Sequence, residues 1–411
     1  MDSRQKTADP SLMFDPQLPF VSKPNWAEVD LDDIAYNTRQ IKNWIGGDVE
    51  LMAVVKGDGY GHGAVMVAKT ALENGATRLA TARVDEGVEL RKAGVTAPIF
   101  VLGYVAGDEM ETLVHWRIDA PLMHWDIAQA LSEISTRQGV VTRVHVKVET
   151  GMGRFGLFPD EAVGFVERVM SLPGLQLEGL YTQFATADET DKSYAYTQFD
   201  RFKGVLSNLA ARGISVPVRH VANSPTTLDL PEAHLDMVRC GTVIYGLYPS
   251  AEVSHSIPLR PALALKSRVA RLRTLPQGWG VSYGRTFIPE APIRAALVPI
   301  GFGDGLRRAL SNVGHVLIRG RQAPVLGRIC MDQCIVDVSD IPDVERDDEV
   351  VLIGRQGELE ISADAMAEAL SSIHYEVLTA ISHRVPRVYL KDGKVVAIRT
   401  LSGFNSAPAL W

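Results

Sequence analysis

A lysine at the head of a glycine-rich turn is the first residue in the sequence that could do chemistry. Lys56 ends the apolar run ELMAVVK (50–56) and opens the segment KGDGYGHG (56–63). A partly desolvated lysine has a lowered pKa and can act as a Schiff-base nucleophile. The glycines of this segment would let the backbone approach a phosphate or a flat ring. The same segment also fits a tight turn with an ion-paired lysine, because short motifs have many false positives.

Two further turns follow apolar runs and carry groups that bind anions. KVETGMGRFG (147–156) contains Arg154, whose guanidinium could hold a carboxylate or phosphate with two hydrogen bonds. HVANSP (220–225) offers the hydroxyl and the backbone N–H of Ser224 to a phosphate. Each has a structural alternative, which is an ion pair for Arg154 and a helix N-cap for Ser224.

A third turn, within VRCGTVIYG (238–246), offers the backbone N–H groups of Gly241 and Thr242. Alternation along the preceding strand would point Arg239 toward the same place. Together with Lys56, these groups suit a phosphorylated cofactor that is joined to a lysine. Pyridoxal phosphate has the required chemistry, because its aldehyde reacts with a lysine and its phosphate needs N–H donors.

The elements that must position these residues alternate between strands and helices. Eight apolar runs follow a first strand-like segment at 26–32, and amphipathic stretches such as 63–75, 161–171 and 198–213 lie between them. Strands that alternate with helices indicate a parallel sheet, and eight such units indicate a closed (βα)8 barrel of the TIM type, with a doubly wound open sheet as the alternative. The eight runs are 50–56, 78–83, 98–104, 119–124, 143–149, 175–184, 218–223 and 237–246.

The pattern changes at about residue 258, where strand-like runs separated by turns predict a second, mainly β domain. Helical patterns are brief there, at 363–372 and 375–381, and Asp392-Gly393 predicts a hairpin within 389–399. The strand-like runs are 263–275, 293–302, 315–320, 334–338 and 349–354. We therefore predict a flexible tail at 1–24, a barrel domain at 25–257 and a β domain at 258–411.

The composition narrows the possible partners. A net charge of −7 over 411 residues argues against a general nucleic-acid or anionic-membrane surface. No apolar run approaches a membrane span, and the first 22 residues have no signal-peptide core, so we expect a cytoplasmic protein. The three cysteines have neither disulfide nor metal-site spacing, so we expect no metal and read them as small buried residues.

Seven segments in order along the chain resemble the alanine racemases. Two of them, KGDGYGHG (56–63) and KVETGMGRFG (147–156), lie around Lys56 and Arg154. The others are HVANS (220–224), VRCGTVIYG (238–246), VSYGRTF (281–287), GRICMDQ (327–333) and YEVLTAISHRVPR (375–387). The resemblance covers about residues 26–390.

The resemblance implies a homodimeric racemase that uses pyridoxal phosphate and interconverts L- and D-alanine for peptidoglycan. Lys56 would form the imine with the cofactor and act as one catalytic base, and Tyr283 of the partner subunit would be the other. Arg239 would bond the pyridine nitrogen. Arg154 and the backbone of Met331 would bind the substrate carboxylate. The groups implied to hold the phosphate are Tyr60, Ser224, Gly241, Thr242 and Tyr375.

Lys147 would be carbamylated, and its new negative charge would orient Arg154. Two bases on opposite faces of the cofactor suit a racemase, which removes a proton from one face and returns it to the other. An arginine does not readily give up a proton, so it keeps the ring nitrogen unprotonated and the carbanion less stabilised. Tyr283 would need nearby positive charge, since the usual pKa of tyrosine is about 10.

The sequence departs from the family pattern at several positions. Gly57 and Gly59 replace alanines, Glu149 replaces an aspartate, Gln183 replaces a histidine near the cofactor ring, and Phe302 replaces a tyrosine near the substrate entrance. Substrate preference is therefore more open than reaction type. The alternatives are a racemase of broader specificity, a fold-related amino-acid decarboxylase, and a pyridoxal phosphate carrier without turnover.

Overall fold

The computed structural model describes residues 23–406, which fall into two compact units. The barrel unit comprises Asp33–Gly59 and Ala64–Pro261. The β unit comprises the chain up to Asp32, the short segment Tyr60–Gly63 and the chain from Ala262 onward. The tail predicted at 1–24 lies almost entirely outside the described residues.

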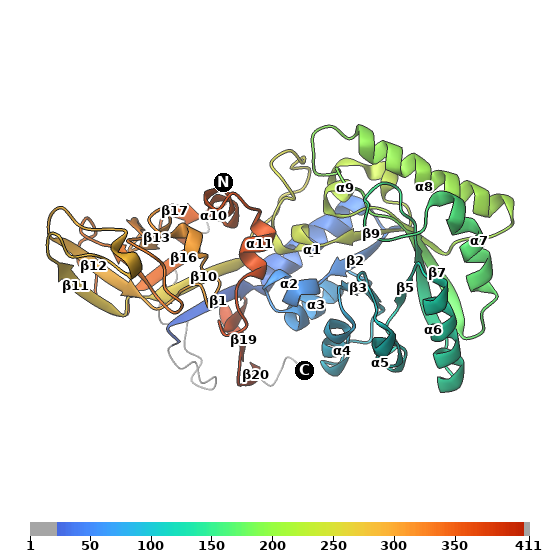
Figure 1. The fold of residues 1–411 in the computed structure, drawn as a ribbon, viewed down its shortest axis with the longest axis horizontal. Coiled ribbons are helices and arrows are strands. Elements are labelled where there is room, and N and C mark those ends of the chain that lie inside the picture. Colours follow the sequence, from blue (N-terminus) through green and yellow to red (C-terminus); the bar gives the residue numbers. More distant parts are fainter. Residues whose placement is uncertain (1–22, 407–411) are drawn as a thin grey trace. The chain divides into compact units, whose positions relative to one another are not determined.

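Eight strands, one for each apolar run that we expected, form the core of the barrel unit (Figure 1). They pair in parallel as β4-β3-β2-β9 and β5-β6-β7-β8. Backbone hydrogen bonds join the two sets, from Asp119 to Ile99 at 2.7 Å and from Arg239 to Ala222 at 2.9 Å, so the ring closes as predicted. The strands are β2 (Glu50–Val54), β3 (Arg78–Thr81), β4 (Ile99–Val101), β5 (Ala120–Leu122), β6 (Thr142–Lys147), β7 (Leu175–Tyr181), β8 (Val218–His220) and β9 (Met237–Cys240).

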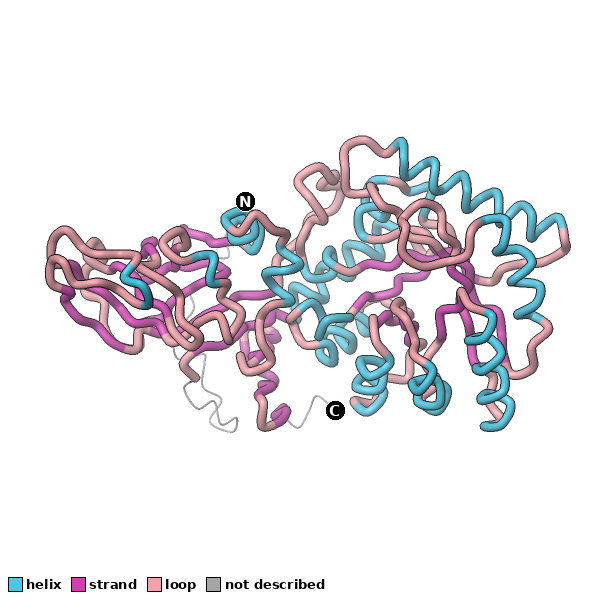
Figure 2. The backbone as a smooth tube through the Cα atoms, viewed as in Figure 1, coloured by secondary structure: helices cyan, strands magenta, loops and turns pink. Residues whose placement is uncertain are grey.

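The helices of the barrel unit lie outside its strands (Figure 2). In α7 (Pro159–Met170) the buried residues recur every three or four positions, which gives the helix one apolar face. The other helices are α1 (Leu31–Ile45), α3 (Ala64–Glu73), α4 (Val84–Lys92), α5 (Met110–His115), α6 (Trp125–Gln138), α8 (Ser193–Ala211) and α9 (Ser224–Asp229), with 3-10 turns η2 (Gly107–Glu109), η3 (Pro231–Ala233) and η4 (Thr242–Tyr245).

The β unit contains a nine-stranded sheet, in the order β14-β13-β16-β10-β1-β18-β19-β20 with β17 on β16, and a three-stranded sheet, β11-β12-β15. Its helices are α10 (Ala363–Ala369) and α11 (His374–Thr379), with 3-10 turns η5 (Tyr283–Arg285) and η6 (Arg308–Leu310). The strands are β1 (Asn25–Asp30), β10 (Leu263–Arg268), β11 (Arg271–Leu275), β12 (Ile293–Val298), β13 (His315–Ile318), β14 (Arg321–Pro324), β15 (Cys334–Asp337), β16 (Glu349–Gln356), β17 (Leu359–Ile361), β18 (Arg387–Lys391), β19 (Lys394–Thr400) and β20 (Gly403–Ser406).

The first strand of the chain lies in the β unit, although our predicted limits of 25–257 assign it to the barrel domain. β1 pairs antiparallel with β10 and parallel with β18. Trp26, Ala27 and Val29 are buried there. Alternating hydrophobicity identifies this strand, but it does not identify the sheet that the strand joins.

The continuous apolar run at 263–275 forms two strands instead of one. β10 joins the large sheet, whereas β11 joins the small one. The hairpin predicted at Asp392-Gly393 is present between β18 and β19, and both turn residues have positive φ, of 52° and 71°. We did not expect β14, β17 and β20, which are only three or four residues long.

Candidate active site

The turn after β2 has an unusual backbone conformation. Four consecutive residues, Gly57 to Tyr60, have φ between 52° and 61°, so the segment labelled α2 (Lys56–Tyr60) is a left-handed turn. Such a conformation costs an L-residue roughly 1–2 kcal/mol, and glycine avoids most of that cost. Hydrogen bonds support the turn, since Gly57 N–H donates to Glu86 Oε1 at 2.6 Å and Ala64 N–H donates to Asp58 Oδ1 at 3.1 Å.

The Lys56 amine, half-buried at the end of β2, is less basic than an ordinary lysine. Burial lowers its pKa, and the positive charges of Arg154 and Arg239 lower it further, while Glu86 partly opposes them. A larger fraction of Lys56 is therefore neutral near physiological pH. A neutral amine at the carboxyl end of a barrel strand can attack a carbonyl or accept a proton.

The buried Arg239 guanidinium has one donor left for a ligand. Its Nη1 donates to the backbone oxygen of His220 at 2.8 Å and to the ring Nδ1 of that residue at 3.1 Å. Its Nη2 donates to the oxygens of Thr182, Gln183 and Val221 at 2.8–3.2 Å. Among the described residues, the Nε–H finds no acceptor. A group that accepts one hydrogen bond, such as a pyridine nitrogen, fits this donor.

Lys147, at the end of β6, belongs to the same electrostatic cluster. Its side chain is buried, and its Nζ lies 5.5 Å from the ring centroids of both Phe155 and Tyr181. Burial first, and then the charges of Arg154 and Arg239, lower its pKa to about 8. Lys147 is thus poised to lose its proton and react as an amine.

The loop that carries Arg154 is organised by Glu149. Burial alone would raise the pKa of Glu149, but backbone N–H groups donate to its carboxylate and lower the pKa overall. Gly151 and Met152 donate at 2.5 Å, and Arg154 donates through its backbone at 3.1 Å. The exposed guanidinium of Arg154 has no partner among the described residues, which leaves it available to an anionic ligand.

The turns after β8 and β9 meet at Ser224 and Gly241. The Gly241 N–H donates to Ser224 Oγ at 3.0 Å, and Ser224 begins α9. Asn223 caps that helix, since its side-chain oxygen accepts from Thr226 N–H at 3.2 Å. Ser224 does not supply that side-chain cap, so the structural alternative that we weighed for it is wrong. Its hydroxyl hydrogen can be donated to a ligand.

The segment Tyr60–Gly63 is packed within the β unit. The buried Arg387 donates from Nε to the Gly61 oxygen at 3.0 Å. A Cβ on Gly61 would lie 2.2 Å from the Leu378 oxygen, and one on Gly63 would lie 1.8 Å from the Tyr389 hydroxyl. These two glycines therefore let the backbone approach the chain's own residues, a role that the sequence reading did not foresee.

This packing brings two of the residues that we predicted to bind phosphate together. The rings of Tyr60 and Tyr375 lie 6.0 Å apart, and His374 stacks on Tyr375 at 4.3 Å. Tyr375 is in the first turn of α11. Two phenol groups side by side can donate hydrogen bonds to one anionic group.

Tyr283 and Met331 are exposed on the β unit, at 72% and 55%. Tyr283 begins η5 between Ser282, which is strained at φ 59°, and Gly284, which adopts φ 71° without strain. The Ser282 hydroxyl donates to the Arg328 oxygen at 2.5 Å. The backbone oxygen of Met331 accepts from Gly303 N–H at 2.9 Å, whereas its own N–H donates to none of the described residues. Both predicted groups are thus presented to the outside of their unit.

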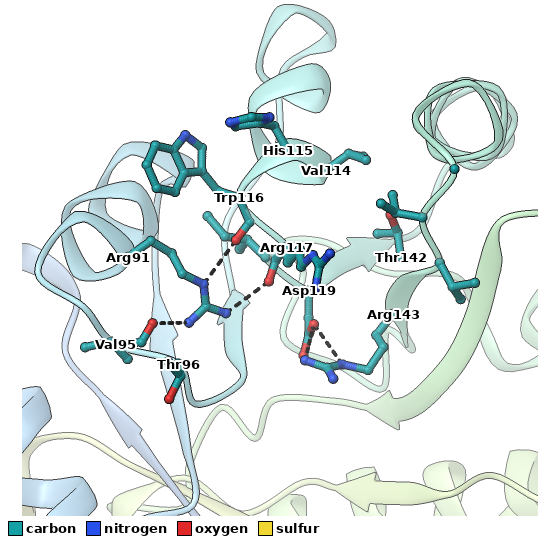
Figure 3. Close-up of a pocket in the computed structure, with 14 residues that line it drawn as sticks. Arg91, Val95, Thr96, Val114, His115, Trp116, Arg117, Asp119, Thr142 and Arg143 are labelled. Carbon is teal, nitrogen blue, oxygen red and sulfur yellow. Dashed lines mark hydrogen bonds and ion pairs between the residues drawn. The ribbon is translucent and has the colours of Figure 1, made fainter.

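A cavity of about 660 Å³ in the barrel unit lies away from this chemistry. Its lining residues precede β4 and β5 or begin β6, at the amino-terminal ends of the strands, whereas barrel enzymes act at the carboxyl ends. Two of its arginines, Arg91 and Arg143, already have partners (Figure 3). Arg91 donates to the carbonyls of Val95, Trp116 and Arg117, and Arg143 pairs with Asp119.

Two residues near Lys56 and Arg239 were not predicted from the sequence. Glu86 sits in the first turn of α4, where an acidic side chain could have been noticed, and it holds the Lys56 turn. His220 lies within the HVANSP motif, but its contact with Arg239 depends on barrel packing. No group of acidic, histidine or cysteine side chains within residues 23–406 could hold a metal ion. None of the helices described is long and apolar enough to cross a membrane.

The fold and these groups define a barrel enzyme with a lysine-centred site at the carboxyl ends of its strands. The family model for the alanine racemase N-terminal domain matches residues 29–249, and the model for the C-terminal domain matches residues 262–389. The chain belongs to the alanine racemase family, as the order of its motifs led us to expect.

Relatives of known sequence and structure cover nearly the whole chain. The alanine racemase of Halothermothrix orenii is 47% identical over 90% of this chain and 97% of its own length. The alanine racemase of Clostridium perfringens strain SM101 is 46% identical over 92% of this chain and 98% of its own. The crystal structure of alanine racemase from Bacillus anthracis with bound L-Ala-P has a TM-score of 0.88 and 39% identity, covering 93% of this chain and 99% of that one.

Proposed function

We propose that this protein binds pyridoxal phosphate through Lys56 and interconverts L-alanine and D-alanine. The observation that carries the proposal is the Nε–H of Arg239, which has no acceptor among residues 23–406 and belongs to a guanidinium that lowers the pKa of Lys56. A cofactor with an aldehyde for the amine and a ring nitrogen for this donor satisfies both groups. The family membership supports the same choice.

Pyridoxal phosphate, when bound, withdraws electrons from the α carbon of an amino acid and makes the α proton acidic. The Arg239 guanidinium stays charged, because burial lowers its pKa only to about 10. It would therefore donate to the ring nitrogen of the bound cofactor and keep that nitrogen unprotonated. A weaker electron sink limits side reactions such as transamination.

Lys56 would remove or return the α proton on one face, and Tyr283 of a second subunit would act on the other face. Tyr283 is exposed in its own unit and begins a short, strained turn, which suits a residue that reaches into another chain. The protein would then work as a homodimer with shared active sites. A cytoplasmic location and a role in peptidoglycan supply stay predictions.

Different groups would bind the phosphate of the cofactor and the carboxylate of the substrate. Arg154 and the N–H of Met331 would bind the carboxylate. A carbamate on Lys147 would attract the Arg154 guanidinium, which an ammonium there would repel. The groups proposed for the phosphate are Tyr60, Ser224, Gly241, Thr242 and Tyr375.

A chiral assay tests the proposal directly. The purified protein is incubated with single L-amino acids, and each D-enantiomer is measured by chromatography. We expect D-alanine as the main product, whereas comparable rates with several amino acids would favour the broader racemase. Carbon dioxide release would favour the decarboxylase, and no turnover with bound cofactor would favour the carrier.

Reduction with borohydride followed by peptide mapping tests the role of Lys56. We expect the pyridoxyl group on Lys56, since its amine has a lowered pKa and lies at the end of β2, within the influence of Arg239. The Lys56→Ala variant should take no label. A label on Lys147 or Lys69 in the wild type would refute the assignment.

A further inference from the structure

Two buried histidines extend inward from Arg239 within the barrel. Arg239 Nη1 lies 3.1 Å from His220 Nδ1, and His220 Nε2 lies 2.9 Å from His145 Nδ1. Arg239 is 4% exposed, and both imidazoles are fully buried. His145 is on β6, and its ring contacts Phe100 and His220.

Arg239 sets the direction of both hydrogen bonds that link Arg239, His220 and His145. A guanidinium has no acceptor, so His220 Nδ1 must offer a lone pair. A neutral imidazole with a free Nδ1 carries its proton on Nε2, and that proton is donated to His145 Nδ1. Burial lowers the pKa of both histidines well below its usual value, so both rings are neutral.

The barrel has features that make room for His145. A Cβ on Gly179 of β7 would lie 2.3 Å from His145 Nδ1. The backbone of Gly179 does not have positive φ, so this glycine is needed for space and not for its conformation. The register between β6 and β7 also shifts between Val144 and His145. Together these features fit the imidazole beside His220.

An apolar side chain would fill this part of the core at lower cost, because a buried polar ring must find hydrogen-bond partners. His145 finds only one, since its Nε2 has no partner among the described residues. Its ring packs on Phe100 at 4.3 Å, a contact that a phenyl or aliphatic group could also make. The bond to His220 is therefore the feature that sets histidine apart at this position.

We propose that His145 is a positioning residue, which accepts the Nε2–H of His220, fixes the orientation of that ring and so holds Arg239 with its Nε–H toward the cofactor nitrogen. This inference rests on the proposed binding of pyridoxal phosphate. Without the acceptor at His145, the buried Nε2–H of His220 would have no partner. The ring would then be free to tilt, its Nδ1 lone pair would move away from Arg239, and the guanidinium could turn.

The first test compares two ligands on the full chain freed of cofactor. One is pyridoxal phosphate, and the other is its analogue with CH in place of the ring nitrogen. We expect His145→Leu to reduce the preference for pyridoxal phosphate over the analogue by about 3- to 10-fold, the range of one lost hydrogen bond. His145→Gln keeps an acceptor oxygen and should restore most of this preference.

Matched controls separate positioning from general damage. His115→Gln changes an exposed histidine on α5 and should leave the preference unchanged. If His145→Leu weakens both ligands equally, or changes neither, the proposal is wrong. If the wild type takes up no pyridoxal phosphate at all, the proposed function is wrong. The NMR experiment below still tests the hydrogen bond between His145 and His220 in that case.

The second test reads the tautomer of His220 in the cofactor-free protein by nitrogen NMR of labelled histidine. We expect His220 to carry its proton on Nε2 in all three proteins, because Arg239 requires the Nδ1 lone pair. That N–H should show a hydrogen-bonded chemical shift in the wild type and in His145→Gln, but not in His145→Leu. A wild-type His220 with its proton on Nδ1 would overturn the proposal without any variant, even if His145→Leu does not fold.

Discussion

Four positively charged side chains at the carboxyl end of the barrel influence one another's protonation. Lys56, Lys147, Arg154 and Arg239 lie close enough for the arginines to lower the pKa of each lysine. The arginines keep their charge, since a guanidinium rarely gives up its proton. The two lysines, and not the arginines, therefore lose their protons more easily. Their neutral amines are then available to react.

Lys147 should be carbamylated in the active protein. Its neutral form adds carbon dioxide with loss of a proton, and a pKa of about 8 makes that form available near neutral pH. We expect a carbamate signal by carbon NMR under labelled carbon dioxide. Lys147→Ala should remove the signal and lower activity about 10- to 100-fold, through misplacement of Arg154.

Lys203→Ala provides a matched control for that experiment, because Lys203 is exposed on α8 and paired with Asp200. It should keep both the signal and the activity. A plain ammonium at Lys147, together with full activity in carbon-dioxide-free buffer, would contradict this prediction and leave the racemase proposal standing.

The same lysine should make stability depend on pH. The pKa of Lys147 falls from 10.5 to about 8 on folding, so between these values the unfolded chain binds more protons than the folded one. The free energy of unfolding should therefore rise with pH across this window in carbon-dioxide-free buffer. Urea titrations at pH 8 and pH 10 test this, and Lys147→Met should show a smaller rise.

At the scale of elements, the left-handed turn after β2 is the most demanding local structure in the site. Two of its residues, Asp58 and Tyr60, have side chains and still adopt positive φ. The Asp58 carboxylate accepts from the Ala64 N–H, which begins α3. That bond helps to hold a conformation that few side chains tolerate.

Asp58→Ala should destabilise the protein by about 1–2 kcal/mol, because it loses the helix cap while the left-handed backbone remains. Asp58→Asn keeps an acceptor oxygen and tolerates positive φ, so its effect should stay within about 0.5 kcal/mol. Urea unfolding of the two variants beside the wild type measures the difference. Equal losses for alanine and asparagine would show that the carboxylate charge, and not the hydrogen bond, supports the turn.

The sequence predicts elements better than it predicts their partners. Periodicity located the eight barrel strands, and the turn after each strand located Lys56, Arg154 and Ser224, because the carboxyl ends of parallel strands share one edge. Periodicity could not place β1 in the β unit, since the hydrophobic pattern of a strand does not show which strands it pairs with. It also could not reveal the pair His145 and His220, which meet only through the stagger of β6, β7 and β8.

At the scale of the whole molecule, the proposed partner base makes each active site depend on two chains. A mixed dimer of Lys56→Ala and Tyr283→Phe subunits would contain one site with both changes and one wild-type site. Statistical mixing makes about half of the dimers mixed, so we expect about a quarter of wild-type activity. Subunits are unfolded together, refolded and assayed, with each variant alone as the control.

No recovery at any mixing ratio, in samples whose dimers are confirmed by light scattering, would place both bases in one chain. Recovery well above a quarter would show that mixed dimers form preferentially. A single-chain site would also require a different explanation for the 72% exposure of Tyr283.

The pairing of β1 with β10 and β18 has a consequence for how the chain is made. A ribosome synthesises β1 early, but its neighbours are more than 230 and 350 residues away, at Leu263–Arg268 and Arg387–Lys391. At roughly 5–20 residues per second, β1 waits on the order of 20–70 s for its second neighbour. During that interval Trp26 and Val29 have no sheet to cover them, and both long edges of the strand are open to other chains. The nascent protein should therefore depend on holding chaperones until translation reaches β18.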